Sequence, residues 1–362
     1  MVSVIDKARS ALGMKHDELD MLGHKIGSTG YGLMGLTWRA NPPSQEQSFA
    51  AMKESLKHGA NFWNGGEIYG NAERNSLHLL REYFEKYPED VKKIVISIKG
   101  GCEVNVLKPN GSEENTRRSI NECIEQLGKV GKKLDLWESA RVAPETPIEI
   151  TMRTAKEFVD AGKLGGISLS ECSADTIRRA SNVAKIEAVE VEFSLWATEI
   201  LDNGVAQACA ELGIPIVAYS PLGRGFLTGQ IKSLDDIPED DMRRHLPRFQ
   251  PENFDANIKL VDDLQQLADK KGCTPGQIAT SWIKAKSGKN GLPVFIPIPG
   301  ATTPERVAEN CVDVDLSDAD VKEIDSLLEK VEVKGERYGG VQLKLAFGST
   351  PPLKEWKSGG DL

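Results

Sequence analysis

Two patterns of apolar residues alternate along most of this chain. Short runs rich in Val, Ile and aromatic residues are typical of buried strands, and longer segments with apolar residues at every third or fourth position are typical of amphipathic helices. The short runs predict strands at residues 25–38, 61–64, 93–99, 134–138, 165–170, 186–193, 214–220 and 293–299. The longer segments predict helices around residues 44–59, 77–84, 120–127, 147–161, 173–182, 203–212, 256–271, 275–286 and 304–310.

The regular alternation of strands and helices predicts the fold class. Strands rich in Val and Ile, each followed by a helix, form parallel sheets, and eight such units predict an α/β protein with a closed (β/α)8 TIM barrel. A doubly wound open sheet is the alternative, but it usually carries a GxGxxG loop after its first strand, and none follows the first strand here. The barrel is expected to span residues 25–330, after a polar N-terminal extension at residues 1–24. Residues 331–362 are expected to form a tail that packs loosely over the barrel mouth.

Composition narrows the range of partners. The 362 residues are 40% hydrophobic and 27% charged, which suits a large folded core, and the net charge of -9 offers no basic face for nucleic acid. The six cysteines lie far apart, without the paired spacing of a metal site, and are predicted to be reduced thiols. No apolar run reaches the roughly 18 residues that a membrane span requires, so a cytoplasmic protein without a membrane partner is expected. The oligomeric state stays open.

The loop after the second predicted strand presents Tyr69, and the third predicted strand ends at Lys99. Catalytic residues of a barrel gather at the C-terminal ends of its strands, so these two side chains are expected to lie near each other. A lysine held near a phenol lowers the pKa of the phenol and prepares it to give a proton to a carbonyl oxygen. Two other interpretations stay open at this point. Tyr69 is an ordinary packed or surface aromatic, or Lys99 extends from the barrel mouth into water.

Distinctive motifs occur at five places in the chain, Asn61–Gly70, Ile94–Gly100, Gly165–Ser168, Ala218–Gly229 and Pro299–Asn310. In their order and spacing they resemble the motifs of the aldo-keto reductase family, and the resemblance extends over residues 22–330. Four further segments resemble the fungal pyridoxal reductase branch of that family, namely Gly32–Trp38, Asn61–Glu67, Leu136–Val142 and Gly162–Ile167. The resemblance implies an oxidoreductase that transfers a hydride from NADPH to a small aldehyde, with pyridoxal, which becomes pyridoxine, as the expected substrate.

The resemblance also implies roles for single residues. Tyr69 matches the family's general acid, and Lys99 matches the lysine that assists it. The usual aspartate of the site falls at Asn64, and the usual histidine falls at Ala140. Residues two apart on a strand share a face, so if Ala140 points into the barrel, Glu138 does too. We therefore expect Glu138 to supply the negative charge that Asn64 lacks, and a glutamate turned outward toward a helix is the alternative.

For the cofactor, NADPH or NADP, the resemblance implies a set of contacts. Ser168 matches the serine that bonds the nicotinamide carboxamide, although Leu169 replaces the adjacent asparagine, and Glu190 stands where glutamine is usual. Tyr219 matches the aromatic residue that stacks on the nicotinamide ring. Other residues expected to contact the cofactor are Met34, Gly35, Ser220, Pro221, Leu222, Gly225, Arg306, Glu309 and Asn310. The residues expected to contact the aldehyde are Trp38, Ala140 and Arg141.

The resemblance places the 2′-phosphate of the cofactor on Arg306, whose forked guanidinium favours NADPH over NADH. Two other functions stay open. One is reduction of a different carbonyl compound by the same chemistry. The other is a nucleotide-binding regulatory protein with weak or no turnover, which Asn64 and Ala140 favour and the retained Tyr69 and Lys99 oppose.

Overall fold

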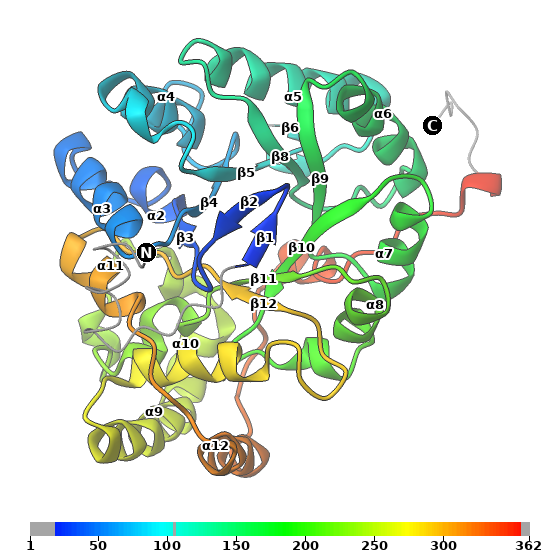
Figure 1. The fold of residues 1–362 in the computed structure, drawn as a ribbon. Coiled ribbons are helices and arrows are strands. Elements are labelled where there is room, and N and C mark those ends of the chain that lie inside the picture. Colours follow the sequence, from blue (N-terminus) through cyan, green and yellow to red (C-terminus); the bar gives the residue numbers. More distant parts are fainter. Residues whose placement is uncertain (1–18, 104–105, 356–362) are drawn as a thin grey trace, which may run out of the picture.

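A sheet of eight parallel strands forms the centre of the computed structural model, which describes residues 19–103 and 106–355 (Figure 1). In order around the sheet the strands are β3 (Tyr31–Gly32), β4 (Phe62–Gly66), β5 (Val95–Gly100), β8 (Leu134–Ser139), β9 (Leu164–Ser170), β10 (Ile186–Glu192), β11 (Ile216–Tyr219) and β12 (Phe295–Pro297). Gly32 beside Gly300 and the amide of Gly30, which donates to the carbonyl of Pro297 at 2.9 Å, join the first strand to the last. The predicted (β/α)8 barrel is confirmed.

Helices surround this barrel, and most of them cover its outside (Figure 1). They are α2 (Met34–Thr37), α3 (Gln45–Lys57), α4 (Ser76–Lys86), α5 (Glu113–Gly128), α6 (Ile148–Asp160), α7 (Ala174–Ser181), α8 (Val205–Glu211), α9 (Pro251–Lys271), α10 (Pro275–Lys286), α11 (Pro304–Asn310), α12 (Asp318–Lys330) and α13 (Gly340–Lys344). Side-chain caps define where several of them begin, because a hydroxyl oxygen accepts a free amide of the first turn. Ser44 caps α3 in this way, and Thr274 caps α10.

Shorter elements lie in the connections. They are strands β6 (Cys102–Glu103) and β7 (Lys108–Pro109) and 3₁₀ helices at Pro88–Asp90, Glu199–Leu201, Gly223–Thr228, Leu234–Asp236, Met242–His245, Pro247–Phe249 and Leu353–Glu355. The apolar pattern did not predict these elements, nor helix α12. In α12 only Ile324 is fully enclosed, so the helix leaves almost no apolar stripe in the sequence.

The prediction of one long first strand at residues 25–38 is wrong. Only β3 joins the barrel, and the residues just after it form the short helix α2. Glycine is required before β3, because a Cβ on Gly30 would lie 2.7 Å from the carbonyl oxygen of Phe62 on the neighbouring strand. The glycines of this segment therefore reflect close backbone packing at the point where the barrel closes.

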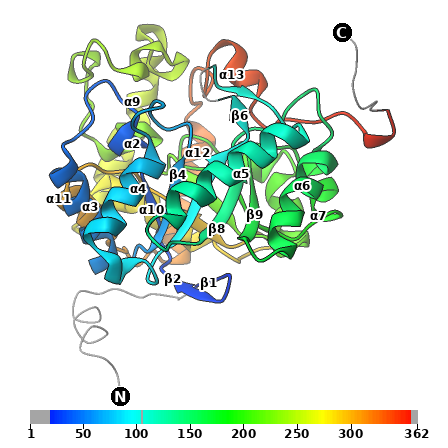
Figure 2. The same ribbon diagram turned by 90° about the horizontal axis from the view of Figure 1, so that it is seen from above.

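The residues before β3 form a hairpin of β1 (Leu19–Met21) and β2 (His24–Ile26), which pair in antiparallel fashion. The expected boundary after residue 24 therefore passes through this hairpin. Its side chains Met21 and Ile26 pack against inward-facing residues of the barrel floor, namely Phe62, Val95, Leu136, Ala188, Val217, Ile296 and Ile298. Figure 2 shows the hairpin at one end of the barrel and α13 at the other. Residues 1–18 of the predicted extension and 356–362 of the predicted tail lie outside the described residues.

Side chains along each strand alternate between an outer and an inner environment. Outward-facing residues such as Trp63 and Trp137 belong to one large apolar core beneath the helices. Inside the barrel, the apolar floor is followed by a layer of buried polar side chains that includes Lys99 and Glu138. Buried charges are costly unless they are paired, so the polar layer marks the part of the barrel where function is expected.

Within the ranges described above, no helix combines the length and the apolar character needed to cross a lipid bilayer. The six cysteines all lie in these ranges and are free, and only Cys273 is partly exposed.

Candidate active site

Four side chains form a buried polar cluster in the middle of the barrel. Lys99 forms ion pairs with two carboxylates, at 3.2 Å between its Nζ and Oε1 of Glu138 and more closely with Glu190. The Nδ2 of Asn64 donates to Oε2 of Glu190 at 2.6 Å and to Oε2 of Glu138 at 3.2 Å. Lys99 is 3% exposed and both glutamates are 1% exposed, so water does not screen these charges.

The strand positions explain why the cluster forms. Lys99 on β5 lies beside Glu138 on β8 in the register of the sheet, so both side chains point into the barrel. Glu138 therefore faces inward, 3.2 Å from Lys99, and the outward orientation is not the one observed. Its Oε2 also accepts from the hydroxyl of Ser97 at 2.9 Å.

Glu190, for which the resemblance implies a contact with the nicotinamide, has its carboxylate bonded to Lys99 and Asn64. The alternation of side chains along β10 could have predicted that Glu190 points into the barrel, because Glu190 shares a strand face with Ala188, a residue of the barrel floor. Sequence alone does not tell how far Lys99 reaches across the barrel.

The charges of this cluster control one another. Burial would lower the pKa of Lys99, but the charges of Glu138 and Glu190 outweigh it and raise this pKa well above its ordinary range. Burial raises the pKa of Glu190 to about 8, and the charge of Glu138 adds to this effect while Lys99 opposes it. Lys99 is therefore an ammonium in the resting site, and Glu190 holds a proton more readily than an ordinary glutamate.

Tyr69 lies above Lys99, on the loop that follows β4. The Nζ of Lys99 is 5.6 Å from the centre of the tyrosine ring. The ring stacks on Trp38 with centroids 5.5 Å apart, and the hydroxyl of Thr37 donates to the carbonyl of Tyr69 at 2.7 Å. The two residues that sequence reasoning paired, Tyr69 and Lys99, thus lie together, and Trp38 lies beside them.

The acidity of Tyr69 depends on the cluster below it. Burial raises the pKa of Tyr69 to about 12, the charge of Lys99 lowers it, and the negative charges of Glu190 and Glu138 raise it again. A proton on either carboxyl group removes one of the negative charges that raise the pKa of Tyr69. The phenol then becomes a stronger acid.

Glu67 anchors the loop that carries Tyr69, a role that the sequence did not reveal. Its carboxylate accepts from the hydroxyl of Ser119 at 2.7 Å, from the amide of Gly101 at 3.2 Å and from both terminal nitrogens of Arg118 at 3.1 Å. These donors lie on the loop after β5 and on α5, the next unit of the barrel. The network therefore holds Tyr69 in place from outside the reaction site.

Ala140 and Arg141 follow β8 at the barrel mouth. Ala140 is buried against Tyr69 and has no donor to offer a substrate. The guanidinium of Arg141 donates to the carbonyl of Ala140 at 2.6 Å and to the hydroxyl of Ser170 at 3.3 Å. Within residues 19–103 and 106–355 it forms no ion pair with a carboxylate, although the charges of Tyr219 and Glu171 raise its pKa against the effect of burial. Arg141 therefore keeps a positive charge and spare donors near Tyr69.

Tyr219 is tied to the segment after α12. Its hydroxyl donates to Oε1 of Glu171 at 2.8 Å and lies 2.6 Å from the hydroxyl of Tyr338. Arg337 forms two hydrogen bonds of 3.1 Å with the carboxylate of Glu171 and one of 3.2 Å with Glu192. Arg337 is only 3% exposed, so the expectation that this tail packs loosely is wrong for residues near Arg337. A buried ion pair holds it against the ends of β9 and β10.

Ser168 does not lie at the barrel mouth. It occupies the middle of β9, is almost fully buried and lies 3.4 Å from the hydroxyl of Ser97. The strand ends two residues later, at Ser170, so Ser170 is the serine at the rim. Leu169, between them, points into the outer apolar core.

The turn after β11 contains Ser220, Pro221, Leu222 and Gly225. Its backbone is unusual, with positive φ angles at Ser220 (49°), Gly223 (55°), Arg224 (58°) and Gly225 (94°). The amides of Gly223 and Gly225 donate to the carbonyls of Ser220 and Leu222 within the turn, at 2.9 and 3.0 Å. Beside this turn, Glu192, Trp196, Arg224, Arg248 and Arg337 line a cavity of about 10 Å³, room for about one water molecule. Arg224 and Arg337 pair with Glu192, and Arg248 pairs with Glu199. The indole nitrogen of Trp196 is buried without a partner among the described residues.

The residues expected at the adenosine end lie on α11, next to the closure of the barrel. Arg306 is half exposed and pairs with Glu309 at 2.7 Å, and Asn310 ends the helix. Met34 and Gly35, on α2, are on the same side, because a Cβ on Gly35 would lie 3.8 Å from the side chain of Thr302. The barrel closure thus brings the first and last cofactor residues of the chain together.

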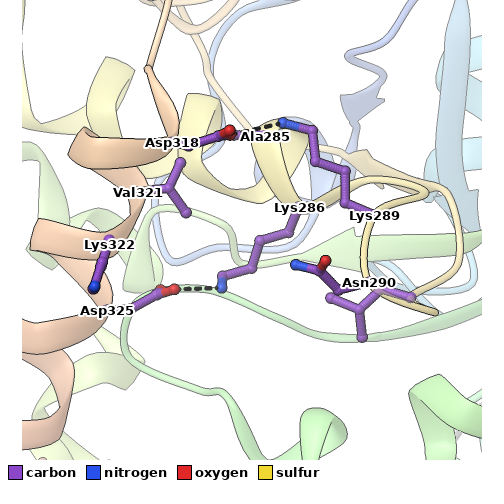
Figure 3. A pocket seen from close by; sticks show the side chains of 9 residues that line it. Ala285, Lys286, Lys289, Asn290, Asp318, Val321, Lys322 and Asp325 are labelled. Atoms are coloured by element: carbon purple, nitrogen blue, oxygen red, sulfur yellow. Dashed lines mark hydrogen bonds and ion pairs between the residues drawn. The ribbon is translucent and has the colours of Figure 1, made fainter.

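A larger cavity of about 430 Å³ lies elsewhere, between α10, α12 and the loop before β12 (Figure 3). Lys286 pairs there with Asp325 at 2.8 Å, and Lys289 pairs with Asp318 at 3.5 Å. The loop leads into the N-terminal end of β12, opposite to the end where barrels carry out chemistry. Because its charges are largely paired within the protein, we assign no function to this cavity.

Comparison with known proteins agrees with this geometry. The sequence profile of the aldo/keto reductase family matches residues 28–329. The chain is 40% identical over 324 residues to probable pyridoxal reductase 2 of Schizosaccharomyces pombe, which covers 87% of this chain and 96% of the relative. It is 38% identical over 336 residues to the NADP(+) aldo-keto reductase yakc of the same organism, which covers 91% of this chain and 96% of the relative.

One solved structure is a similar barrel. The glycerol dehydrogenase from Gluconobacter oxydans matches with a TM-score of 0.73 over 88% of this chain and 95% of that chain. The sequences are 20% identical, so the comparison supports the fold and not a shared substrate.

Proposed function

Because the chain belongs to the aldo/keto reductase family, we propose that it uses NADPH to reduce the aldehyde of pyridoxal to the alcohol pyridoxine. The observation that carries the proposal is the position of Tyr69, whose ring centre is 5.6 Å from the ammonium of Lys99. In this proposal Tyr69 gives its proton to the carbonyl oxygen, and Lys99 stabilises the phenolate that remains. An oxidoreductase of the family with these two residues in contact distance is expected to turn over, which speaks against a purely regulatory protein.

The cofactor proposal combines several features of the barrel mouth. A bound nicotinamide supplies the hydride, and the face of Tyr219 offers it a stacking surface. The turn Ser220–Gly225 is the proposed pyrophosphate site, since it carries Arg224 and a guanidinium group binds phosphate oxygens. Arg306 suits the 2′-phosphate because it is half exposed and only its partner Glu309 on the same helix has to release it. A relative that carries NADP(+) in its name supports the preference for NADPH.

Arg141 and Trp38 support pyridoxal as the substrate. Pyridoxal is an aromatic aldehyde whose phenolic oxygen is attached to the ring carbon adjacent to the one that carries the aldehyde group. A guanidinium with spare donors near Tyr69 suits that oxygen, and the partly exposed ring of Trp38, stacked on Tyr69, suits the pyridine ring. The relative named probable pyridoxal reductase 2 supports the same choice.

An assay of the purified protein tests the proposed function. NADPH oxidation is followed with pyridoxal and, in parallel, with simple aldehydes that lack a phenolic oxygen. We expect the highest kcat/KM with pyridoxal and a lower value when NADH replaces NADPH. Turnover of the simple aldehydes alone would select another carbonyl substrate. Binding of NADPH without turnover of any aldehyde would select the regulatory protein.

The substitution Arg141→Gln tests the substrate contact. It is expected to raise the KM for pyridoxal about 10- to 100-fold, because a hydrogen bond to a charged group contributes about 1.5–3 kcal/mol. The KM of a simple aldehyde without the phenolic oxygen is expected to change little. Steady-state kinetics with both substrates measure the difference, and Arg153→Gln, at an exposed position on α6, is the control. An equal increase of both KM values would mean that Arg141 supports the site without recognising the phenolic oxygen.

A further inference from the structure

We propose that Glu138 and Glu190 share one proton at neutral pH, carried by Glu190, and that this proton passes through Lys99 to restore the hydroxyl of Tyr69 after each turnover. The second half rests on the proposed function, since it requires Tyr69 to act as the general acid. Glu190 acts through Lys99, so it is a positioning residue that also stores a proton.

The first argument is the balance of charge. Lys99 brings one positive charge into the buried cluster, and Glu138 and Glu190 bring two carboxyl groups. With both carboxyl groups ionised, the cluster would hold one uncompensated negative charge away from water, which is strongly unfavourable. Asn64 adds no charge, and it links the two carboxyl groups through its single amide nitrogen. One proton on the pair makes the cluster neutral.

The groups that face Glu190 come from several strands. Lys99 from β5, Glu138 from β8 and Tyr69 after β4 act on its charge or respond to it. From β11, the ring of Tyr219 lies 5.7 Å from the Nζ of Lys99. Glu192, the next inward residue of β10, pairs with Arg337 and Arg224, so its charge is compensated at the rim.

The location of the proton follows from the environment of Glu190. Burial and the neighbouring charge of Glu138 raise the pKa of Glu190 to about 8, so the proton is present at neutral pH and lost in alkaline solution. The proton also prepares Tyr69 for its task, because an ionised Glu190 raises the pKa of Tyr69 and a neutral one does not. When Glu190 loses its proton, Tyr69 therefore becomes a weaker acid and also loses the source of the proton that restores its hydroxyl.

The proton balance is simple. The O–H bond of Tyr69 breaks when its proton goes to the carbonyl oxygen, and a phenolate remains. An N–H proton of Lys99 passes to that phenolate. The O–H proton of Glu190 then passes to the neutral amine of Lys99, whose Nζ donates a hydrogen bond to Oε1 of Glu190 in the resting site. Tyr69 and Lys99 are then as before, Glu190 is a carboxylate, and a proton from water reloads it. One proton is consumed for each carbonyl group reduced, as the overall reaction requires.

The same arrangement accounts for two departures from the family pattern. The usual aspartate is replaced by Asn64, and the usual glutamine is replaced by Glu190. In the structure both side chains contact Lys99 and each other.

The pH dependence of kcat tests the proton supply. For the wild type, kcat is expected to be constant below pH 8 and to fall by about tenfold per pH unit above it, as Glu190 loses its proton. Glu190→Gln cannot ionise, so its kcat is expected to be lower at neutral pH but without the alkaline fall. Glu138→Gln removes the neighbouring charge, so the fall is expected to begin at lower pH. Glu187→Gln, on the same strand and paired with Lys185, is the control that keeps the wild-type profile.

Infrared spectroscopy of the protein without cofactor or substrate tests the stored proton directly. At pH 7 a carbonyl band of a protonated carboxyl group is expected, lost above pH 8 in the wild type and in Glu187→Gln, and absent in Glu190→Gln. A band unaffected by Glu190→Gln, or an alkaline fall of kcat that persists in this variant, would overturn the proposal. The band together with no turnover of any aldehyde would refute the proposed function and the proton transfer, but not the shared proton. If Glu190→Gln does not fold, titration of the wild-type band decides whether a buried carboxyl group ionises near pH 8.

Discussion

Replacement of Tyr69 by Phe is expected to lower kcat for pyridoxal by about 10²- to 10⁴-fold, the range that a general acid contributes. The variant removes one oxygen and keeps the ring, so the stacking on Trp38 is retained. Lys99 keeps its ion pairs with both glutamates, because neither pair involves the phenol. The loss is therefore expected in proton donation and not in the assembly of the site. Steady-state kinetics measure kcat, and fluorescence titration measures the affinity for NADPH, which is expected to stay close to that of the wild type.

A matched variant separates chemistry from stability in this experiment. Tyr83 is also a buried tyrosine, but its hydroxyl donates to Asp90 at 2.8 Å on the outside of the barrel. Tyr83→Phe is expected to keep kcat and to lose about 1.5–3 kcal/mol of the free energy of unfolding, the usual contribution of a hydrogen bond to a charged group. A Tyr69→Phe variant with near-normal kcat would refute the assignment of Tyr69 as the acid.

Replacement of Arg337 by Met is expected to lower the free energy of unfolding by about 3–5 kcal/mol, because breaking a buried ion pair leaves a buried charge without a partner. Glu171 loses both of its hydrogen bonds to the guanidinium, and Glu192 keeps only Arg224. Methionine fills a similar volume, so the expected loss reflects charge and not a cavity. Urea denaturation of both proteins measures it.

The control for this prediction is an exposed ion pair. Arg178 and Glu211 lie 2.7 Å apart with side chains 43% and 47% exposed, and such pairs contribute about 0–1 kcal/mol. Arg178→Met is therefore expected to change the free energy of unfolding by less than about 1 kcal/mol. A loss of the same size in both variants would show that Arg337 is no more important than a surface charge.

The pH dependence of stability gives a second measure of this ion pair. Burial alone would raise the pKa of Glu171, but Arg337 outweighs it and lowers the pKa from 4.5 to about 2. A carboxyl group whose pKa is lower in the folded state stabilises that state at every pH above the pKa that it has in the unfolded chain. This contribution is lost as the pH falls toward 2. In Arg337→Met this acid-side loss is expected to disappear, because the ion pair is absent at every pH.

Several elements of the barrel were predictable because their signals are local. Helix α10 begins and ends at the predicted residues, since Thr274 caps it and Pro275 suits its first turn. The strand that leads to Lys99 was predicted from its run of Val and Ile. The first strand was not predicted correctly, because residues 25–38 belong to three different elements. These are a hairpin, a short strand and a short helix.

The site was predictable only in part. Tyr69 and Lys99 were found because a barrel brings the C-terminal ends of its strands together, and the parity of β8 placed Glu138 inside. The sequence does not reveal the bond between Lys99 and Glu190, because the two residues lie on different strands. Nor does it reveal the roles of Glu67 and Arg337, because each acts through contacts with residues far away in the sequence.

The sequence by itself determined the number of barrel strands, their order along the chain and which of their residues share a face, because spacing along one strand is enough to specify these features. Only the tertiary structure decided that two carboxylates meet one lysine and that Arg337 reaches Glu171. These contacts depend on the register of neighbouring strands and on the closure of the barrel. A buried charge takes the partner that lies within a few ångströms in space, and distance along the chain does not limit that choice.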